Sequence, residues 1–167
     1  LTIPTAGVLN PQEGTVEFWW NPLAKTPQAF PSLIATGRWT SSPITQDWLA
    51  IHWGSGWSNA NTVVFAMYNK NGTSNFNFSV TLNPQPYTWY YVAAKWSFVT
   101  RIAKLIIYRP DGTYESTQAT INGEPPTFEG WDKFYILQTW DNGPSRANSL
   151  IDDLRISSIA RSDEEIL

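Results

Sequence analysis

The sequence predicts an all-β protein, an antiparallel sandwich or jelly roll. Short segments alternate apolar and polar residues with a period of two, as strands with one buried face do. Gly, Pro, Asn and Asp separate these segments at short intervals. Helix signals are confined to the end of the chain. Many short strands with almost no helix are typical of a two-sheet sandwich.

The predicted strands follow one another along the whole chain. Alternation is clearest in "NFNFSV" (75–80), which places its Phe and Val side chains inward and its Asn and Ser side chains outward. The other predicted strands are "TVEFWW" (15–20), "DWLAIHW" (47–53), "TVVFAMY" (62–68), "WYYVAAKW" (89–96), "AKLIIYRP" (103–110), "KFYILQTW" (133–140) and "SLIDDLRIS" (149–157).

Specific turn signals join several of these strands. Asn71-Gly72 and Asp111-Gly112 are strong signals for tight hairpins, because both dipeptides accept positive φ angles. At the end of the chain, Ser162 followed by Glu165 forms a capping-box pattern. It predicts a short helical turn at the C-terminus.

Composition excludes several classes of function. The 167 residues fit a single domain, 1–167. The net charge is −3 and Lys and Arg are not clustered, which argues against nucleic acid or an anionic membrane as partner. Cysteine is absent, so disulfides and thiol chemistry are excluded. Because the chain opens at Leu1 without a signal-peptide pattern, we expect a module cut from a larger protein.

Four phrases in order resemble one family. They are "EGTVEFWWNP", "WYYVAAKWS", "KLIIYRPDGT" and "SLIDDLRISSIARSDEEI", which together extend from about Glu13 to Ile166. This order is similar to the laminin-G-like, concanavalin-A-like jelly roll of the lectin/glucanase superfamily. The resemblance implies two antiparallel sheets, and a carbohydrate-binding, adhesion or accessory module of an extracellular, cell-surface or virion-surface protein.

Catalysis is not expected. Related glucanases hold two carboxylates on one strand as Glu-x-Asp-x-x-Glu, and this chain lacks that string. Asp152 and Asp153 are adjacent, so a regular strand would turn them to opposite faces. His52, the single histidine, has no Ser or Cys motif to serve as a base. We therefore predict that the chain is not an enzyme.

A tryptophan-rich segment supplies the main candidates for sugar binding. A sugar ring presents an apolar face that stacks on a flat aromatic ring and a rim of hydroxyls that needs polar groups. In "GRWTSSPITQDWLAIHWGSGW" (37–57), alternation sends Trp53 to the core and points Trp48 and His52 outward or into a groove. Whether Trp48 is a core or a surface residue stays open at this point. Trp39 and Trp57 lie among Gly, Ser and Asn, where we expect exposure.

We predict structural roles for four other tryptophans and for one ion pair. Trp19, Trp20, Trp89 and Trp96 lie in strands of the family pattern, where packing is the simpler role. If the first and last long strands are neighbours, as the resemblance implies, Arg155 can pair with Glu17.

A second cluster, "LQTWDNGPSR" (137–146), suits three interpretations. Trp140, Asp141 and Asn142 fit a sugar, a calcium ion or an Asx turn. The family often binds one structural calcium, so the resemblance adds weight to the ion as a candidate and leaves the three interpretations open. Asp152 is predicted to point into the sandwich, where it needs hydrogen bonds or calcium. The metal candidates are therefore Asp141 and Asp152.

The function that best fits these features is a non-catalytic carbohydrate-binding module. Its predicted partners are a polysaccharide or glycan and other domains of its parent protein. The predicted binding residues are Trp39, Asp47, Trp48, His52, Trp57, Asn59, Tyr68, Trp140, Asp141 and Asn142. The alternative is a structural or adhesion module of a surface or viral fibre protein, which would bury the same aromatic residues in protein contacts.

Overall fold

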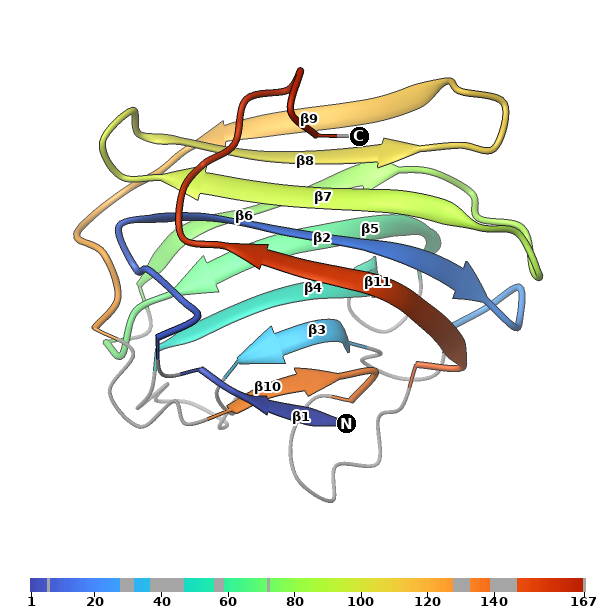
Figure 1. The fold of residues 1–167 in the computed structure, drawn as a ribbon, viewed down its shortest axis with the longest axis horizontal. Coiled ribbons are helices and arrows are strands. Elements are labelled where there is room, and N and C mark those ends of the chain that lie inside the picture. Colours follow the sequence, from blue (N-terminus) through green and yellow to red (C-terminus); the bar gives the residue numbers. More distant parts are fainter. Residues whose placement is uncertain are drawn as a thin grey trace.

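The protein is a two-sheet sandwich. The computed structural model describes residues 1–5, 7–27, 32–36, 47–55, 59–71, 73–127, 133–138 and 147–166. Within these ranges the chain forms strands and turns without a helix, and the strands build two antiparallel sheets (Figure 1). The predicted all-β architecture is confirmed. In the same ranges, no helix has the length and apolar character needed to span a membrane.

One sheet has six strands in the order β1-β10-β3-β4-β5-β6. Their bounds are β1 (Thr2–Pro4), β3 (Ser32–Thr36), β4 (Trp48–Ser55), β5 (Asn59–Tyr68), β6 (Ser74–Thr81) and β10 (Lys133–Ile136). The second sheet has five strands in the order β11-β2-β7-β8-β9. Their bounds are β2 (Glu13–Pro22), β7 (Tyr90–Ser97), β8 (Ile102–Tyr108), β9 (Tyr114–Thr120) and β11 (Ser149–Ser157).

The core lies between the sheets and takes every second side chain from the long strands. Phe18 and Trp20 of β2 point inward and are fully buried, as the alternation predicts. Trp53 of β4 is also fully buried, which confirms its predicted core position. The Trp20 and Trp53 rings meet edge-on with centroids 5.3 Å apart. This contact joins the two sheets through large apolar surfaces.

The predicted Asp111-Gly112 turn lies between the expected strands, whereas Gly72 of the predicted Asn71-Gly72 turn lies outside the described residues. β8 and β9 are joined at Asp111-Gly112, where Gly112 has a φ of +81°. The Asp111 carboxylate accepts hydrogen bonds from the Thr113 amide (2.9 Å) and hydroxyl (2.7 Å), which lower the pKa of Asp111. Between β5 and β6, the Asn69 amide donates to the Thr73 carbonyl at 3.0 Å.

Strand β11 departs from regular alternation. Its register against β2 shifts between Asp152 and Arg155, and Asp153 has a φ of +47°. Residues on the N-terminal side of this bulge therefore face the opposite way from the prediction. Ile151 packs against the core, while Asp152 and Asp153 are both exposed. The prediction that Asp152 points inward is therefore wrong.

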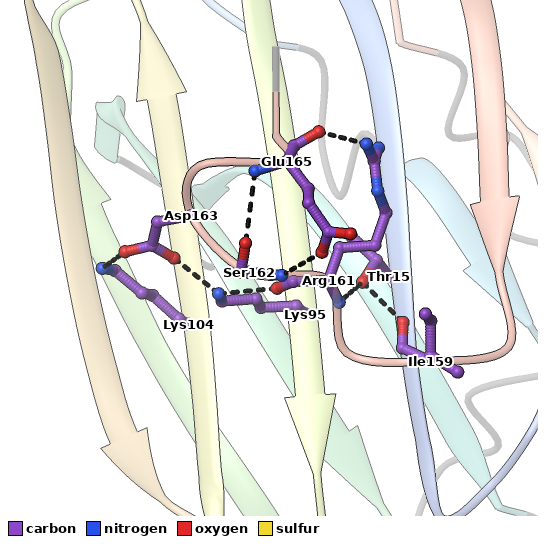
Figure 2. A network of polar contacts seen from close by, with 8 residues as sticks. All are labelled: Thr15, Lys95, Lys104, Ile159, Arg161, Ser162, Asp163 and Glu165. Carbon is purple, nitrogen blue, oxygen red and sulfur yellow. Dashed lines mark hydrogen bonds and ion pairs between the residues drawn. The ribbon is translucent and has the colours of Figure 1, made fainter.

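The C-terminal tail, residues 158–166, folds back over the five-stranded sheet (Figures 1 and 2). Lys104 and Lys95, from neighbouring strands, both bind the Asp163 carboxylate and hold its pKa below the usual range. The Ser162 amide donates to the Glu165 carboxylate (2.8 Å) and the Glu165 amide to the Ser162 hydroxyl (3.3 Å). The capping-box bonds are therefore present, although the segment forms a turn rather than a helix.

Candidate functional site

The outer face of the six-stranded sheet holds several of the predicted binding residues. In β4, Leu49, Ile51 and Trp53 are fully buried in the core, so Trp48 and His52 lie on the opposite face. Trp48 pairs in register with Tyr68 of β5. Two hydrogen-bonded strands thus bring three predicted residues together on one surface.

The rings of these residues pack side by side. The Trp48 centroid lies 4.9 Å from that of His52 and 5.7 Å from that of Tyr68. Asn77 of β6 donates its Nδ2 to the Tyr68 hydroxyl at 2.7 Å. We name Trp48, His52, Tyr68, Asn77 and Ser32 the Trp48 cluster. It combines aromatic surface with hydroxyl, amide and imidazole groups.

His52 is a neutral member of the Trp48 cluster. Its Nδ1 shares a hydrogen bond of 3.0 Å with the hydroxyl of Ser32, a fully buried residue of β3. Burial disfavours the charged imidazolium and lowers the pKa of His52 from 6.5 to about 4. The imidazole therefore stays uncharged at neutral pH and offers a hydrogen bond without a charge.

Exposure differs within the Trp48 cluster. The Trp48 side chain is 5% exposed, so its ring supports its neighbours instead of offering a free face. Tyr68 and His52 are half-buried, and Asn77 is exposed. The groups open to a ligand are thus the two smaller rings and the carboxamide.

Asp47, predicted as a polar contact to the sugar, has a structural position. It is 1% exposed, and its Oδ1 accepts the Lys70 amide at 2.7 Å. Its Oδ2 accepts the amide and hydroxyl of Thr127 at 2.8 and 3.1 Å. Both carboxylate oxygens therefore bind the protein's own chain. They hold the segments around Lys70 and Thr127 beside the start of β4.

The remaining predicted positions divide into two groups. Asn59 begins β5 and pairs with Ser55. Trp39, Trp57, Trp140, Asp141 and Asn142 lie outside the described residues. The hypotheses about sugar stacking by these tryptophans and about calcium at Asp141 stay predictions.

The other metal candidate, Asp152, is exposed on β11, and its Oδ1 accepts the Asp153 amide at 2.9 Å. In the described parts of the chain, no three His, Cys, Asp or Glu side chains converge as metal ligands. Asp152 and Asp153 instead line the mouth of a cleft of about 890 Å³, whose walls include Ile3, Ile136 and Leu154.

The sequence as a whole matches one family from end to end. Residues 1–167 match the family described as the concanavalin A-like lectin/glucanases superfamily. The chain belongs to this superfamily. The resemblance drawn from the strand motifs is thereby confirmed. No curated protein matches the chain in sequence.

Solved structures of the same fold include a module and a domain of sialidases. The Ruminococcus gnavus IT-sialidase CBM40 bound to α2,3-sialyllactose is 14% identical, with a TM-score of 0.66 over 93% of this chain and 80% of that chain. The NanB sialidase of Streptococcus pneumoniae, in a K499G mutant, is 14% identical with a TM-score of 0.72, over 99% of this chain and 26% of that one.

A phage protein shares the fold as well. Tailspike protein 2 of bacteriophage CBA120 is 12% identical, with a TM-score of 0.60 over 97% of this chain and 24% of that chain. At these identities, the likeness to lectin-like modules shows the superfamily's fold and leaves ligand choice to the site.

A second aromatic surface, which the sequence analysis missed, crosses the outer face of the five-stranded sheet. Trp19, Tyr91, Tyr108 and Tyr114 occupy matched register positions on β2, β7, β8 and β9. Their successive ring centroids lie 5.1, 6.3 and 5.2 Å apart. We name these four residues the aromatic row. The Asp111-Gly112 hairpin fixes Tyr108 opposite Tyr114, so part of this alignment was readable from the sequence.

Proposed function

We propose that the protein is a non-catalytic carbohydrate-binding module and that the Trp48 cluster is its glycan site. The observation behind this proposal is the convergence of the half-buried Tyr68 ring, the half-buried neutral imidazole of His52 and the exposed carboxamide of Asn77 on one sheet face. A sugar ring stacks on the aromatic surface and exchanges hydrogen bonds with the polar groups beside it.

Each accessible group has a defined task in this proposal. Tyr68 offers ring surface and a hydroxyl, and the buried Trp48 ring packs beside it and fixes its position. Asn77 already donates one amide hydrogen to Tyr68, which leaves its carbonyl oxygen and second amide hydrogen for sugar hydroxyls. His52, held by Ser32, contributes the edge of a neutral ring.

A binding role fits these residues better than hydrolysis. Glycoside hydrolysis generally needs two carboxyl groups placed on either side of the scissile bond. Asp47, a carboxylate predicted to bind the sugar, has both oxygens occupied by Lys70 and Thr127. Glu17 of the opposite sheet is fully buried and bound by Tyr91 and Arg161.

The comparisons support a glycan as the ligand class and a surface setting. A solved relative is a CBM40 bound to sialyllactose, and another is part of a phage tailspike. Sialylated glycans therefore belong in the first ligand set, beside neutral polysaccharides. We place the module outside the cell or on a cell or virion surface, attached to further domains.

Affinity electrophoresis in gels containing single polysaccharides, paired with glycan-array binding for sialyllactose, tests the site. We expect retardation in at least one gel or binding to at least one array glycan. Asn77→Ala should weaken that binding several-fold, because it removes hydrogen bonds to sugar hydroxyls. Thr81→Ala is the matched control, since Thr81 is an exposed residue farther along the same face of β6. Equal binding by Asn77→Ala and the control would refute the site.

A further inference from the structure

The aromatic row crosses one sheet, with its most exposed rings at the two ends. Trp19 is 36% exposed and Tyr114 is 57% exposed. Tyr108 is half-buried and lies on β8, the strand between β7 and β9. Tyr91 lies deeper at 5% and donates its hydroxyl to Glu17 at 2.7 Å, which fixes the centre of the row. Four strands span three inter-strand gaps, so the row is about 14 Å long.

The C-terminal tail borders this row on one side. Ile166 is 2% exposed and packs with Tyr91, Ala93 and Ile106, against which Tyr108 also rests. In Figure 1 the tail crosses the left and middle parts of the sheet and leaves the right-hand ends of β8 and β9 open. The tail thus holds the inner rings in place and leaves the outer rings accessible.

Polar groups lie along the row. Asp152 is the register partner of Trp19 and is exposed, so its carboxylate can accept hydrogen bonds at that end. Tyr108 and Tyr114 add phenol hydroxyls. Ring faces flanked by such groups match the two chemical faces of a sugar.

The size of the row favours a narrow ligand over a protein partner. A fully covered aromatic side chain buries 150–250 Å², so the exposed parts of these rings sum to roughly 300 Å². A stable protein interface needs about 800 Å² from each partner. Lys95, Lys104 and Asp163 form charged pairs beside the row, so the apolar strip does not widen on that side.

We infer that the aromatic row is a second glycan-binding surface, one that takes a linear neutral oligosaccharide lying across the strands. This second surface goes beyond the proposed function, which concerns the outer face of the six-stranded sheet. A module with ligand surfaces on both outer faces can engage two chains of a polysaccharide, or two segments of one chain. Avidity then exceeds the affinity of either surface.

Isothermal titration calorimetry of the full chain with cellohexaose, xylohexaose and mannohexaose tests this inference. At least one hexasaccharide should bind. Trp19→Ala and Tyr114→Ala should each weaken binding by roughly three- to tenfold, the value of one ring contact. Ile102→Ala is the matched control, because Ile102 is 43% exposed on the same face of β8 and lies outside the row. Unfolding midpoints check that each variant folds.

The outcomes separate this inference from the proposed function. Binding that persists in Asn77→Ala but falls in both row variants supports the second surface. Binding that is lost in Asn77→Ala and unchanged in both row variants overturns the second surface and supports the first. Failure of all three hexasaccharides to bind also overturns it, whatever the Trp48 cluster binds. Self-association in sedimentation velocity that Trp19→Ala abolishes overturns it in favour of a protein contact.

Discussion

At the scale of single residues, Gly14 shows how closely the core constrains the sequence. A Cβ at Gly14 would lie 2.5 and 2.6 Å from two ring carbons of Trp96, its register partner on β7. Trp96 is fully buried and cannot move outward without disturbing its neighbours. The glycine in "EGTVEFWW" is therefore required by packing, since the ring fills the space of a side chain.

We predict that Gly14→Ala destabilises the fold by about 1–3 kcal/mol through overpacking. Urea unfolding followed by circular dichroism measures the change. In Gly14→Ala/Trp96→Phe the smaller ring relieves the clash, so the double variant should be more stable than the sum of the single changes implies, by more than about 0.5 kcal/mol. Strict additivity would show that the contact is not the cause.

His52 links the Trp48 cluster to pH. The pKa of His52 is about 4 in the folded protein and 6.5 without burial, so the unfolded state binds more protons between these values. The free energy of unfolding should therefore fall as the pH drops from 6.5 to 4, by at most about 3 kcal/mol from this residue. Below pH 4 this contribution is constant.

Urea unfolding of wild type and His52→Gln at several pH values between 7 and 4 measures that contribution. The stability of wild type should drop more steeply than that of the variant across this window. Parallel curves would mean that His52 is as easily protonated in the folded state as in the unfolded state.

At the scale of elements, the tail and β2 are joined through a buried charge. Glu17 is fully buried, accepts the Tyr91 hydroxyl at 2.7 Å, and is bound by the guanidinium of Arg161. This hydrogen bond to Glu17 raises the pKa of Arg161. Burial and the bond to Glu17 raise the pKa of Tyr91 far above its usual value, so its hydroxyl remains a donor.

Arg161→Ala should destabilise the protein by about 3 kcal/mol, because it leaves Glu17 buried without its cation. The exposed pair Arg109–Glu115 provides the control, and Arg109→Ala should cost less than about 1 kcal/mol. Thermal and urea unfolding compare the two variants. Adding Glu17→Gln to Arg161→Ala should restore part of the loss. Equal costs for both arginines would argue against a buried ion pair.

Element by element, the alternation in the sequence predicted most faces correctly. It placed Phe18, Trp20 and Trp53 in the core and Asn77 outside. It failed where one extra residue enters a strand, as at Asp153 in β11, because no local pattern announces a bulge. It also did not predict the burial of Asn75, whose fully buried side chain donates to the carbonyls of Asn122 and Glu124.

The ion-pair partner of Glu17 was also predicted incorrectly: Arg155 was expected, and Arg161 binds it. The predicted neighbourhood of the first and last long strands is correct, and Arg155 lies opposite Glu17 in register. The ion pair nevertheless includes Arg161, because the tail turns back over the sheet after β11 (Figure 2). The alternation of apolar and polar residues in the strands cannot predict that the C-terminal tail folds back over the sheet.

At the scale of the whole molecule, the sandwich offers two outer faces with aromatic surface, and the sequence revealed one of them. Trp48, His52 and Tyr68 were predicted from loop-adjacent tryptophans and alternation. Trp19 was assigned to packing because it lies in a strand of the family pattern, yet it is 36% exposed. Outer and inner positions of a strand can both be aromatic, and only the register across four strands shows that the outer ones line up.

A titration of tryptophan fluorescence tests most directly whether the protein binds a glycan. The wild-type chain would be titrated, with calcium present, against soluble plant, algal and bacterial polysaccharides and sialyllactose. Ligand stacked near Trp48 or Trp19 should change their emission, so we expect a saturable shift for at least one class of glycan. A flat response across the whole panel would contradict glycan binding and favour an adhesion module that uses its aromatic surfaces for protein contacts.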